Sequence, residues 1–419
     1  MWIIAGDVLN TQYFVIPIGN FAGFELQFTR ILLLAFTLYF LYLICIRSIG
    51  RHHSTIGTRI YRYEIYLSLY FILSLVAMLF HLSRSLTLKE ITVVYSGWLT
   101  FLVFYYTAKN TVDLGFVKSV FYSILCVGIL SSLVSIIQFF IDPYFMRAGV
   151  GRVAFAGKLR SDGVFTAEYT QSYFLIPAIM LTLTIIKNKY RYLLMGVFLI
   201  GILLTFHRMS WIITILTITG YYLLCAPKRE KIFAIGSILV LSLIMVSLMP
   251  IVLNINSDFV NDRLFSNTVS GRTTIYEVAF RRMQNTWLFG VGSVRTNVYY
   301  ADILKSGEVW AATGEIGGIH NLFLNMGYFY GLPVVVSFCI FLISTVIFFA
   351  KKMYRFGTFY FVPTATIGMF ILANLSNWFY LNMQVSLLLS IILGISVAVY
   401  QKRLNIHEII VFKKNAEVL

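Results

Sequence analysis

Long apolar segments recur along almost the whole chain, and they restrict its fold more than any other feature. Each is about 20 residues long, which is the length that an α-helix needs to cross a bilayer. Strands of a membrane barrel would instead alternate over about ten residues. Since a chain in lipid must satisfy its own backbone hydrogen bonds, we expect helices. We predict about eleven spans, near residues 29–47, 65–83, 91–108, 117–141, 169–186, 192–206, 209–226, 232–253, 321–350, 357–375 and 383–400. A weaker twelfth segment, 2–18, is interrupted by Asp7 and Asn10.

Charged residues make up only 12% of the chain, against about 25% in soluble domains. The formal net charge of +16 could indicate nucleic-acid binding, but the basic residues form no single patch and we expect no nucleic-acid partner. They lie in short connectors at 47–62, 109–118, 187–191, 228–231, 351–355 and 402–414. With the spans predicted above, these connectors fall on one side of the membrane and hold 19 of the 33 basic residues. The positive-inside rule predicts that this side is cytoplasmic.

Two long connectors remain on the other side of the membrane. We therefore predict an all-α polytopic membrane protein with 11–12 transmembrane helices and one long extracytoplasmic loop. Its parts are a helix bundle over 1–253 with a short outer loop at 142–169, a long outer loop over 254–319, further spans over 320–400, and a cytoplasmic tail at 401–419. Loops of this length inside a compact fold are usually functional, so we expect the chemistry there.

Several common site types are absent from the sequence. Asp-x-Asp, a Walker loop, His-Glu-x-x-His and Gly-x-Ser-x-Gly do not occur, and the four cysteines lie in apolar runs without paired spacing. We read the cysteines as small core residues and expect no metal and no cofactor. The start of the chain has no basic region before its apolar stretch, so we expect no cleaved signal peptide. What remains is a metal-independent reaction on an anionic, activated substrate.

Arginine dominates the basic residues of the predicted outer side, whereas the inner side has 8 arginines against 11 lysines. Either residue would satisfy topology, but only arginine offers a planar fork that grips phosphate at two points. The pattern favours an anionic outer ligand; the alternative is contact with lipid headgroups and local acidic residues. The outer arginines are Arg84, Arg147, Arg152, Arg160, Arg208, Arg263, Arg272, Arg281, Arg282 and Arg295.

The long loop contains one predicted amphipathic helix. Ser270 is its expected N-cap, which would place Arg272 in the first turn, where free backbone amides favour anions. Ile275, Val278, Ala279, Met283 and Trp287 form its expected apolar stripe. The following Phe289-Gly-Val-Gly-Ser293 reads as a turn, either a weak phosphate loop or a helix stop.

Short motifs resemble those of the bacterial superfamily of O-antigen polymerases and ligases. The resemblance is architectural over the whole chain and reaches motif level over 205–215 and 270–335. The matching segments are His207-Arg208 (Ser-Arg in the family), Gly271-Arg272, Leu288-Phe-Gly-Val-Gly292, His320-Asn321 and an Arg-x10-Gly pattern from Arg152 to Gly163. The ligase signature has Gly, Thr or Tyr where this chain has Val334, which weakens a ligase reading.

The resemblance implies a GT-C-like membrane glycosyltransferase that inverts the anomeric centre without metal. Its donor would be a glycan on undecaprenyl pyrophosphate, and its acceptor a second lipid-linked repeat unit (polymerase) or lipid A–core (ligase). It also implies a bacterial inner-membrane protein whose active site faces the periplasm or exterior, working with a chain-length regulator.

From the pattern of outer arginines and the family resemblance together, we expect two catalytic residues. Arg272 would stabilise the leaving pyrophosphate, and His320 would activate the acceptor hydroxyl. We expect substrate contacts from Arg208, Arg160, Arg152, Arg147, Asn321 and Arg281.

Two other classes of membrane protein are alternatives to a transferase. A flippase for lipid-linked oligosaccharides also has about a dozen spans, but flippases commonly consist of two similar halves with short loops. A receptor or structural membrane protein is the remaining alternative.

Overall fold

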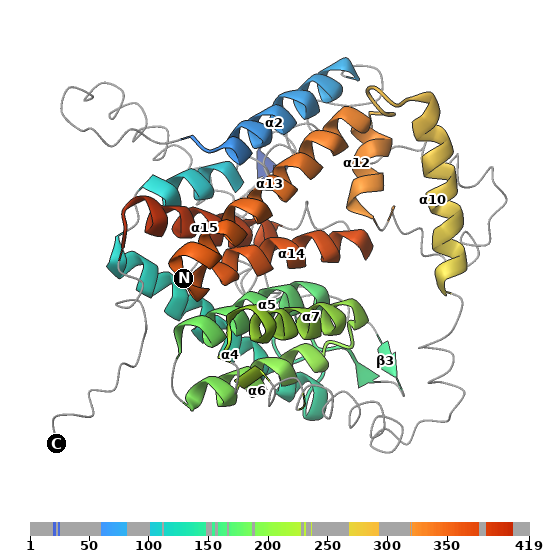
Figure 1. Cartoon of the computed structure of the whole chain (residues 1–419). Coiled ribbons are helices and arrows are strands. Elements are labelled where there is room, and N and C mark those ends of the chain that lie inside the picture. Colours follow the sequence, from blue (N-terminus) through green and yellow to red (C-terminus); the bar gives the residue numbers. More distant parts are fainter. Residues whose placement is uncertain are drawn as a thin grey trace, which may run out of the picture.

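The computed structural model is a helical bundle with two small hairpins (Figure 1). It describes residues 20–21, 24–25, 60–81, 101–110, 113–147, 153–155, 158–165, 167–186, 189–227, 230–231, 236, 268–292, 319, 321–376 and 383–404. The helices are α2 (Arg62–Phe80), α4 (Leu114–Phe140), α5 (Glu168–Ile185), α6 (Tyr190–Leu203), α7 (Arg208–Cys225), α10 (Thr268–Asn285), α12 (Leu322–Tyr330), α13 (Leu332–Phe356), α14 (Phe361–Ser376) and α15 (Met383–Gln401). Residues 101–110 are also helical, and Thr358–Tyr360 form a 3-10 turn.

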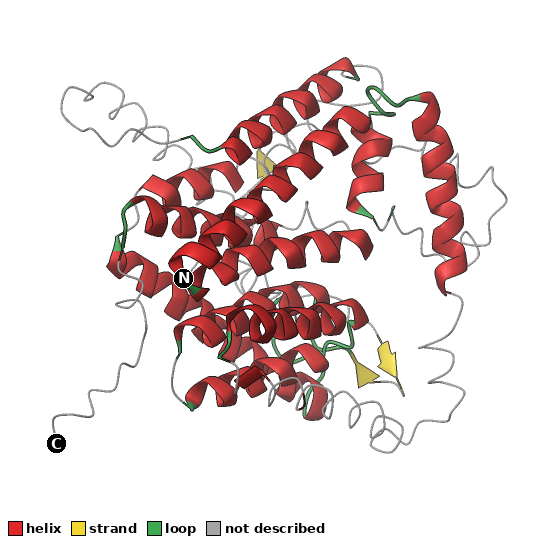
Figure 2. Cartoon of the chain, in the orientation of Figure 1, coloured by secondary structure: helices red, strands yellow, loops and turns green. Residues whose placement is uncertain are grey.

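The hairpins are the short yellow elements of Figure 2. Strands β1 (Asn20–Phe21) and β2 (Phe24–Glu25) pair antiparallel, and so do β3 (Val153–Phe155) and β4 (Lys158–Leu159). The second hairpin belongs to the short outer loop between α4 and α5.

Within the described residues, five helical segments are long and apolar enough to cross a membrane: α2, α4, α7, α13 and 358–375. Tyr190–Leu203 and Val385–Gln401 are shorter apolar helices. The predicted class, a polytopic all-α membrane protein, is therefore confirmed. The predicted spans 2–18, 29–47 and, apart from residue 236, 232–253 lie outside the described residues, as does the first part of 91–108.

Contacts between helix ends define two ends of the bundle. At one end, the Tyr61 ring lies 4.8 Å from that of Phe348 and 6.4 Å from that of Tyr400. At the other end, the Ser161 amide donates to the Leu204 carbonyl at 3.0 Å. These contacts place the start of α2 beside the ends of α13 and α15, and the α4–α5 loop beside the end of α6; the alternation along the whole chain stays a prediction. We call the first end inner and the second outer, following the prediction from the basic connectors.

Helix α5 forms the centre of the lower half of the bundle (Figure 1). All of its residues except Tyr169 are buried, and it packs against α4, α6, α7, α14 and α15. A helix that is buried on every side needs no lipid-facing stripe. Its first turn lies at the outer end, beside the predicted site.

The predicted single span 321–350 is in fact two helices. Gly331, with φ +92°, separates the nine residues of α12 from the 25 residues of α13. That φ lies in the region that glycine adopts without steric cost. At 1.5 Å per residue α13 is about 37 Å long, so it can cross the bilayer without α12.

A buried ion pair joins α2 to the helix at 101–110 near the inner end. The Lys109 Nζ lies 2.5 Å from Glu64 Oε1, and both side chains are at most 2% exposed. The Tyr105 hydroxyl donates to the same oxygen at 2.6 Å, and the Tyr61 amide donates to Oε2 at 2.7 Å. Both carboxylate oxygens are thus satisfied, as a buried charge requires.

Replacing Lys109 with Met should destabilise the chain by on the order of 3 kcal/mol, because the Glu64 carboxylate would stay buried without its cation. Adding Glu64→Gln should recover part of that loss. The measurement is the thermal unfolding midpoint in detergent, with Lys351→Met, at an exposed lysine of the inner end, as the control. Equal midpoints for the single and double variants would refute this account.

Candidate functional site

The short outer loop is fixed to the bundle by one glutamine of α4. The Gln138 side-chain Oε1 accepts hydrogen bonds from the amides of Asp162 (3.1 Å) and Gly163 (2.9 Å), and its Nε2 donates to the Gly163 carbonyl (2.9 Å). Gly163 has φ +61°, and a Cβ there would overlap Ser131. The glycine that ends the Arg-x10-Gly pattern is thus required by the backbone conformation and by close packing.

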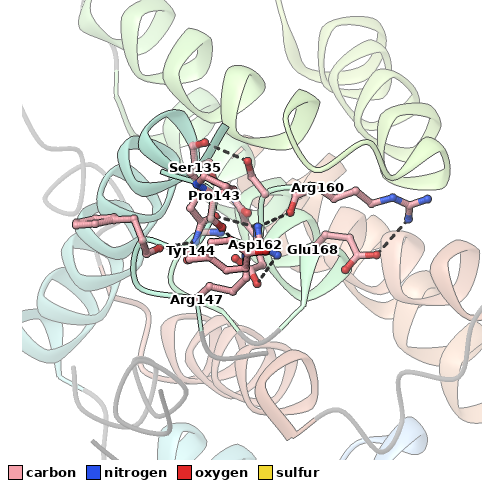
Figure 3. A network of polar contacts seen from close by, with 12 residues as sticks. Ser135, Pro143, Tyr144, Arg147, Arg160, Asp162 and Glu168 are labelled. Carbon is pink, nitrogen blue, oxygen red and sulfur yellow. Dashed lines mark hydrogen bonds and ion pairs between the residues drawn. The ribbon is translucent and has the colours of Figure 1, made fainter. Parts of the chain in front are cut away.

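Arg147 is enclosed by this loop. Its guanidinium pairs with Asp162 at 3.3 Å and donates to the carbonyls of Pro143 (2.8 Å) and Arg160 (2.7 Å), and its side chain is 4% exposed. Figure 3 shows these contacts converging on one guanidinium. We expected Arg147 to bind substrate; the contacts instead use it to hold the loop in place.

Arg160 has a different environment. Its side chain extends away from the Arg147–Asp162 pair toward Glu168, in the first turn of α5 (Figure 3). The Arg160 Nη1 lies 3.1 Å from Glu168 Oε1, and the arginine side chain remains 22% exposed. This cation is thus oriented by one carboxylate oxygen while part of it faces outward, which suits contact with an anionic ligand.

In the turn between α6 and α7, His207 has the capping role that a serine could also fill. The His207 Nδ1 accepts a hydrogen bond from the Ser210 amide at 3.3 Å, so the imidazole caps α7 as a serine oxygen would. Arg208 follows as the first residue of α7 and is exposed. The Ser172 and Thr205 hydroxyls lie 2.9 Å apart, so the start of α5 adjoins this turn. Arg208 and Arg160 therefore both lie at the outer ends of α5 and α7.

Helix α10 crosses the outer side of the molecule and packs against α12 (Figure 1). The helix already includes Thr268, so two predictions were wrong: Ser270 is not its N-cap, and Arg272 lies beyond the first turn. The Arg272 side chain is outside the described residues. Arg281 is 74% exposed and lies 3.6 Å from Glu277.

The predicted apolar stripe of α10 is confirmed only in part. Ala279 is buried and Met283 is half-buried, while Trp287 is 56% exposed. Because α10 ends at Asn285, Trp287 belongs to the following turn and no longer follows the helical period. The side chains of Ile275 and Val278 are outside the described residues.

Asn321 caps α12. Its Oδ1 accepts from the Leu324 amide at 3.0 Å, and its Nδ2 donates to the Leu375 carbonyl of α14 at 3.2 Å. Asn321, which we expected to bind substrate, thus links the start of α12 to the outer end of α14. His320 and Arg152 lie outside the described residues.

Sequence reasoning missed the two carboxylates that the arginines use. Glu168 and Asp162 are buried, and each pairs with an arginine eight or more positions away. The only signal was that two acidic residues follow the last arginine of this loop. In the part of the chain that the structure describes, no three His, Cys, Asp or Glu side chains cluster closely enough to hold a metal ion.

Burial raises the pKa of the Asp162 carboxyl from 3.8 to about 6, although Arg147 and the Gln138 side chain act to lower it. A raised native pKa means that the folded chain binds this proton more tightly than the unfolded chain. The stabilisation is therefore complete below about pH 4 and is lost as pH rises through about 6. At about 1.4 kcal/mol per pKa unit, the difference is roughly 3 kcal/mol.

Replacing Asp162 with Asn should remove this dependence, because the amide does not titrate. Thermal unfolding midpoints of both proteins in detergent, measured from pH 4 to pH 8, test it. The native protein should lose stability relative to the variant as pH rises, and a constant difference across that range would contradict the assignment.

Comparison with known proteins covers part of this site. A family model described as O-antigen ligase matches residues 193–339, which run from α6 into α13. The match includes Arg208, Arg272, Arg281, His320 and Asn321, whereas Arg147, Arg152 and Arg160 precede it. No curated protein matches the chain. This match over residues 193–339 supports the resemblance of that part of the chain to the superfamily of O-antigen polymerases and ligases.

Proposed function

We propose that the chain is a polymerase of lipid-linked polysaccharide repeat units in a bacterial inner membrane. It would transfer a glycan from undecaprenyl pyrophosphate to a hydroxyl group of another lipid-linked repeat unit. The supporting observation is that exposed Arg208 at the start of α7 and partly exposed Arg160 lie at the same outer ends. Helix N-termini and arginine forks both favour phosphate, so this place suits a pyrophosphate.

In the reaction we propose, the acceptor oxygen attacks the anomeric carbon of the donor. The carbon–oxygen bond to pyrophosphate breaks, and the pyrophosphate leaves with the electron pair. Arg272 and Arg208 stabilise that charge as it develops, without metal. His320 takes the proton of the acceptor hydroxyl. Inversion at the anomeric carbon follows from a single displacement.

The remaining candidates have supporting roles in this proposal. Arg160, oriented by Glu168, completes the cation field with Arg152, and Arg281 extends it along α10. Arg147 acts indirectly by holding the loop that bears Arg160. The site faces the periplasm or exterior, and a chain-length regulator is the expected partner.

A ligase that transfers to lipid A–core is the second candidate, and the description of the matching family model favours it. The position where ligases have Gly, Thr or Tyr is Val334 here, which is 1% exposed in α13. That side chain packs in the core, so its effect on the choice of acceptor would be indirect. The two candidates differ only in the acceptor, which makes the acceptor the variable to test.

The test uses purified protein in detergent with a synthetic undecaprenyl-pyrophosphate-linked repeat unit, with EDTA and without nucleotide. We expect a ladder of lipid-linked glycans on a gel. His320→Ala should abolish the ladder, and Arg208→Ala should slow it by about 10²-fold or more, since one preorganised donor to a developing anion is worth that much. The control is Arg355→Ala, at an exposed arginine of the inner end, which should leave the rate unchanged.

The other outcomes separate the candidates. Transfer only after addition of lipid A–core would replace the polymerase by the ligase. No transfer to either acceptor would exclude both and return a flippase to consideration. A ladder that EDTA abolishes would contradict the metal-independent mechanism.

A further inference from the structure

The turn after α10 docks on the break between α12 and α13. Three backbone hydrogen bonds join the two segments: Leu332 N to Trp287 O (2.7 Å), Val291 N to Tyr328 O (2.9 Å) and Gly292 N to Phe329 O (2.9 Å). We call residues 287–292 together with 328–332 the outer joint. Backbone bonds of this kind fix both the separation and the direction of the two segments, because they leave no rotatable side chain between them.

Gly331 is the part of the outer joint that tolerates least change. Its φ is +92°, and a Cβ there would overlap the Leu288 carbonyl oxygen. Gly357, at the inner end of the same helix, has φ +109° but has no atom within 4 Å of a Cβ placed there. The two glycines share a backbone conformation that L-residues rarely adopt, and only the first is packed against another segment.

Helix α2 supplies a third segment to the outer joint. His81, directly after α2, has its Nε2 3.1 Å from the Phe289 carbonyl oxygen. Since a carbonyl can only accept, the imidazole donates from Nε2. The Phe80 ring stacks on Phe289 at 4.3 Å, and Gly292 lies so close to the His81 ring that a Cβ would overlap it. The turn is thus held from both sides.

The outer joint has a consequence for the catalytic residues. Both α10 and α12 end at it, so both helices run away from the same fixed point. Along their length, Met283 of α10 packs on Gly327 of α12. Helix α10 carries Arg272, and α12 begins directly after His320 and its cap Asn321.

We propose that His81 is a positioning residue for glycosyl transfer: through the outer joint it holds α10, and with it Arg272, in place relative to α12. The proposal rests on the proposed function of Arg272 and His320. His81 touches no reacting group in this account. It acts on the Phe289 carbonyl, which orients the turn that ends α10.

The experiment compares five proteins, purified in detergent as full chains: the native chain, His81→Ala, His81→Gln, Gly331→Ala and Gly357→Ala. Glutamine can still donate to the Phe289 carbonyl, so it tests rescue by a conservative change. Gly357→Ala carries the same backbone strain without the packed neighbour. For each protein we would measure kcat and KM for the lipid-pyrophosphate donor per folded molecule, with folding judged by the unfolding midpoint.

A second readout does not depend on turnover. Arg281 and Arg282 are exposed on α10 and are cleavage sites for trypsin. If the hydrogen bonds of the outer joint are weakened, α10 should unfold locally more often and be cleaved faster, because the rate of proteolysis follows the population of the locally unfolded form. Cleavage at these two residues can be followed by mass spectrometry of the fragments.

We expect His81→Ala and Gly331→Ala to lose at least about tenfold in kcat/KM and to be cut faster in α10, since small displacements of a catalytic group are costly. His81→Gln and Gly357→Ala should stay near the native values in both readouts. Native-like kcat/KM in His81→Ala, or an equal loss in Gly357→Ala, would overturn the proposal. If the native chain transfers nothing, the proposed function fails, and equal trypsin rates in all five proteins would separately refute the outer joint.

Discussion

The burial of α5 among the other helices is the constraint on which the rest of the helix bundle depends. A helix in contact with lipid must be apolar on its outer face, whereas α5 carries buried Gln171, Ser172, Thr182 and Thr184. Each of these side chains donates a hydrogen bond inside the bundle; the Gln171 Nε2, for example, donates to the Ser135 hydroxyl at 2.5 Å. The surrounding helices supply the apolar exterior, so α5 can bring Glu168 to the outer end without exposing polar groups to hydrocarbon.

Arg147 and Arg160, both in the short outer loop, show that the surroundings of an arginine decide its role. Three nitrogens of the Arg147 guanidinium have partners within the loop, and little of its surface remains. Arg160 instead has one carboxylate partner at the edge of the bundle. A guanidinium whose donors are used internally stabilises structure, and one held at the surface by a single counter-ion remains available to an anion. Charge alone does not separate these two cases.

Much of the fold was predictable, because transmembrane helices follow from the lengths of apolar runs. The predicted boundaries of α5 and α7 fall within a few residues of those observed. The break at Gly331 was not predictable in this way, since the apolar run continues through it and the backbone packed against Gly331 is that of Leu288, 43 residues earlier in the sequence. The start of α10 was misplaced for a related reason: a plausible cap residue can also occur inside a helix.

For the candidate site, the sequence predicts which residue types take part, but it does not predict which residues contact one another. The excess of outer arginines indicated an anionic ligand, and the motif residues indicated where. The partners of those arginines depend on how α4, α5 and the α6–α7 turn converge, which is a long-range property. The Gly-x-Gly turn, which could have been a phosphate loop, is occupied by contacts to α2 and α12, and its amides at Val291 and Gly292 already donate to carbonyls.

The division of one apolar run into α12 and α13 also sets the level in the membrane at which α12 begins. Because α13 alone is long enough to cross the hydrocarbon, α12 is free to pack within the outer end, and its cap Asn321 bonds to the last turn of α14. The residues at the start of α12 therefore lie level with the helix ends, where lipid headgroups would be. A polyprenyl donor of the kind proposed could present its pyrophosphate at that level while its tail stays in the bilayer. Extracting such a tail would cost about 0.8 kcal/mol for every methylene exposed to water, and a site at headgroup level avoids that cost.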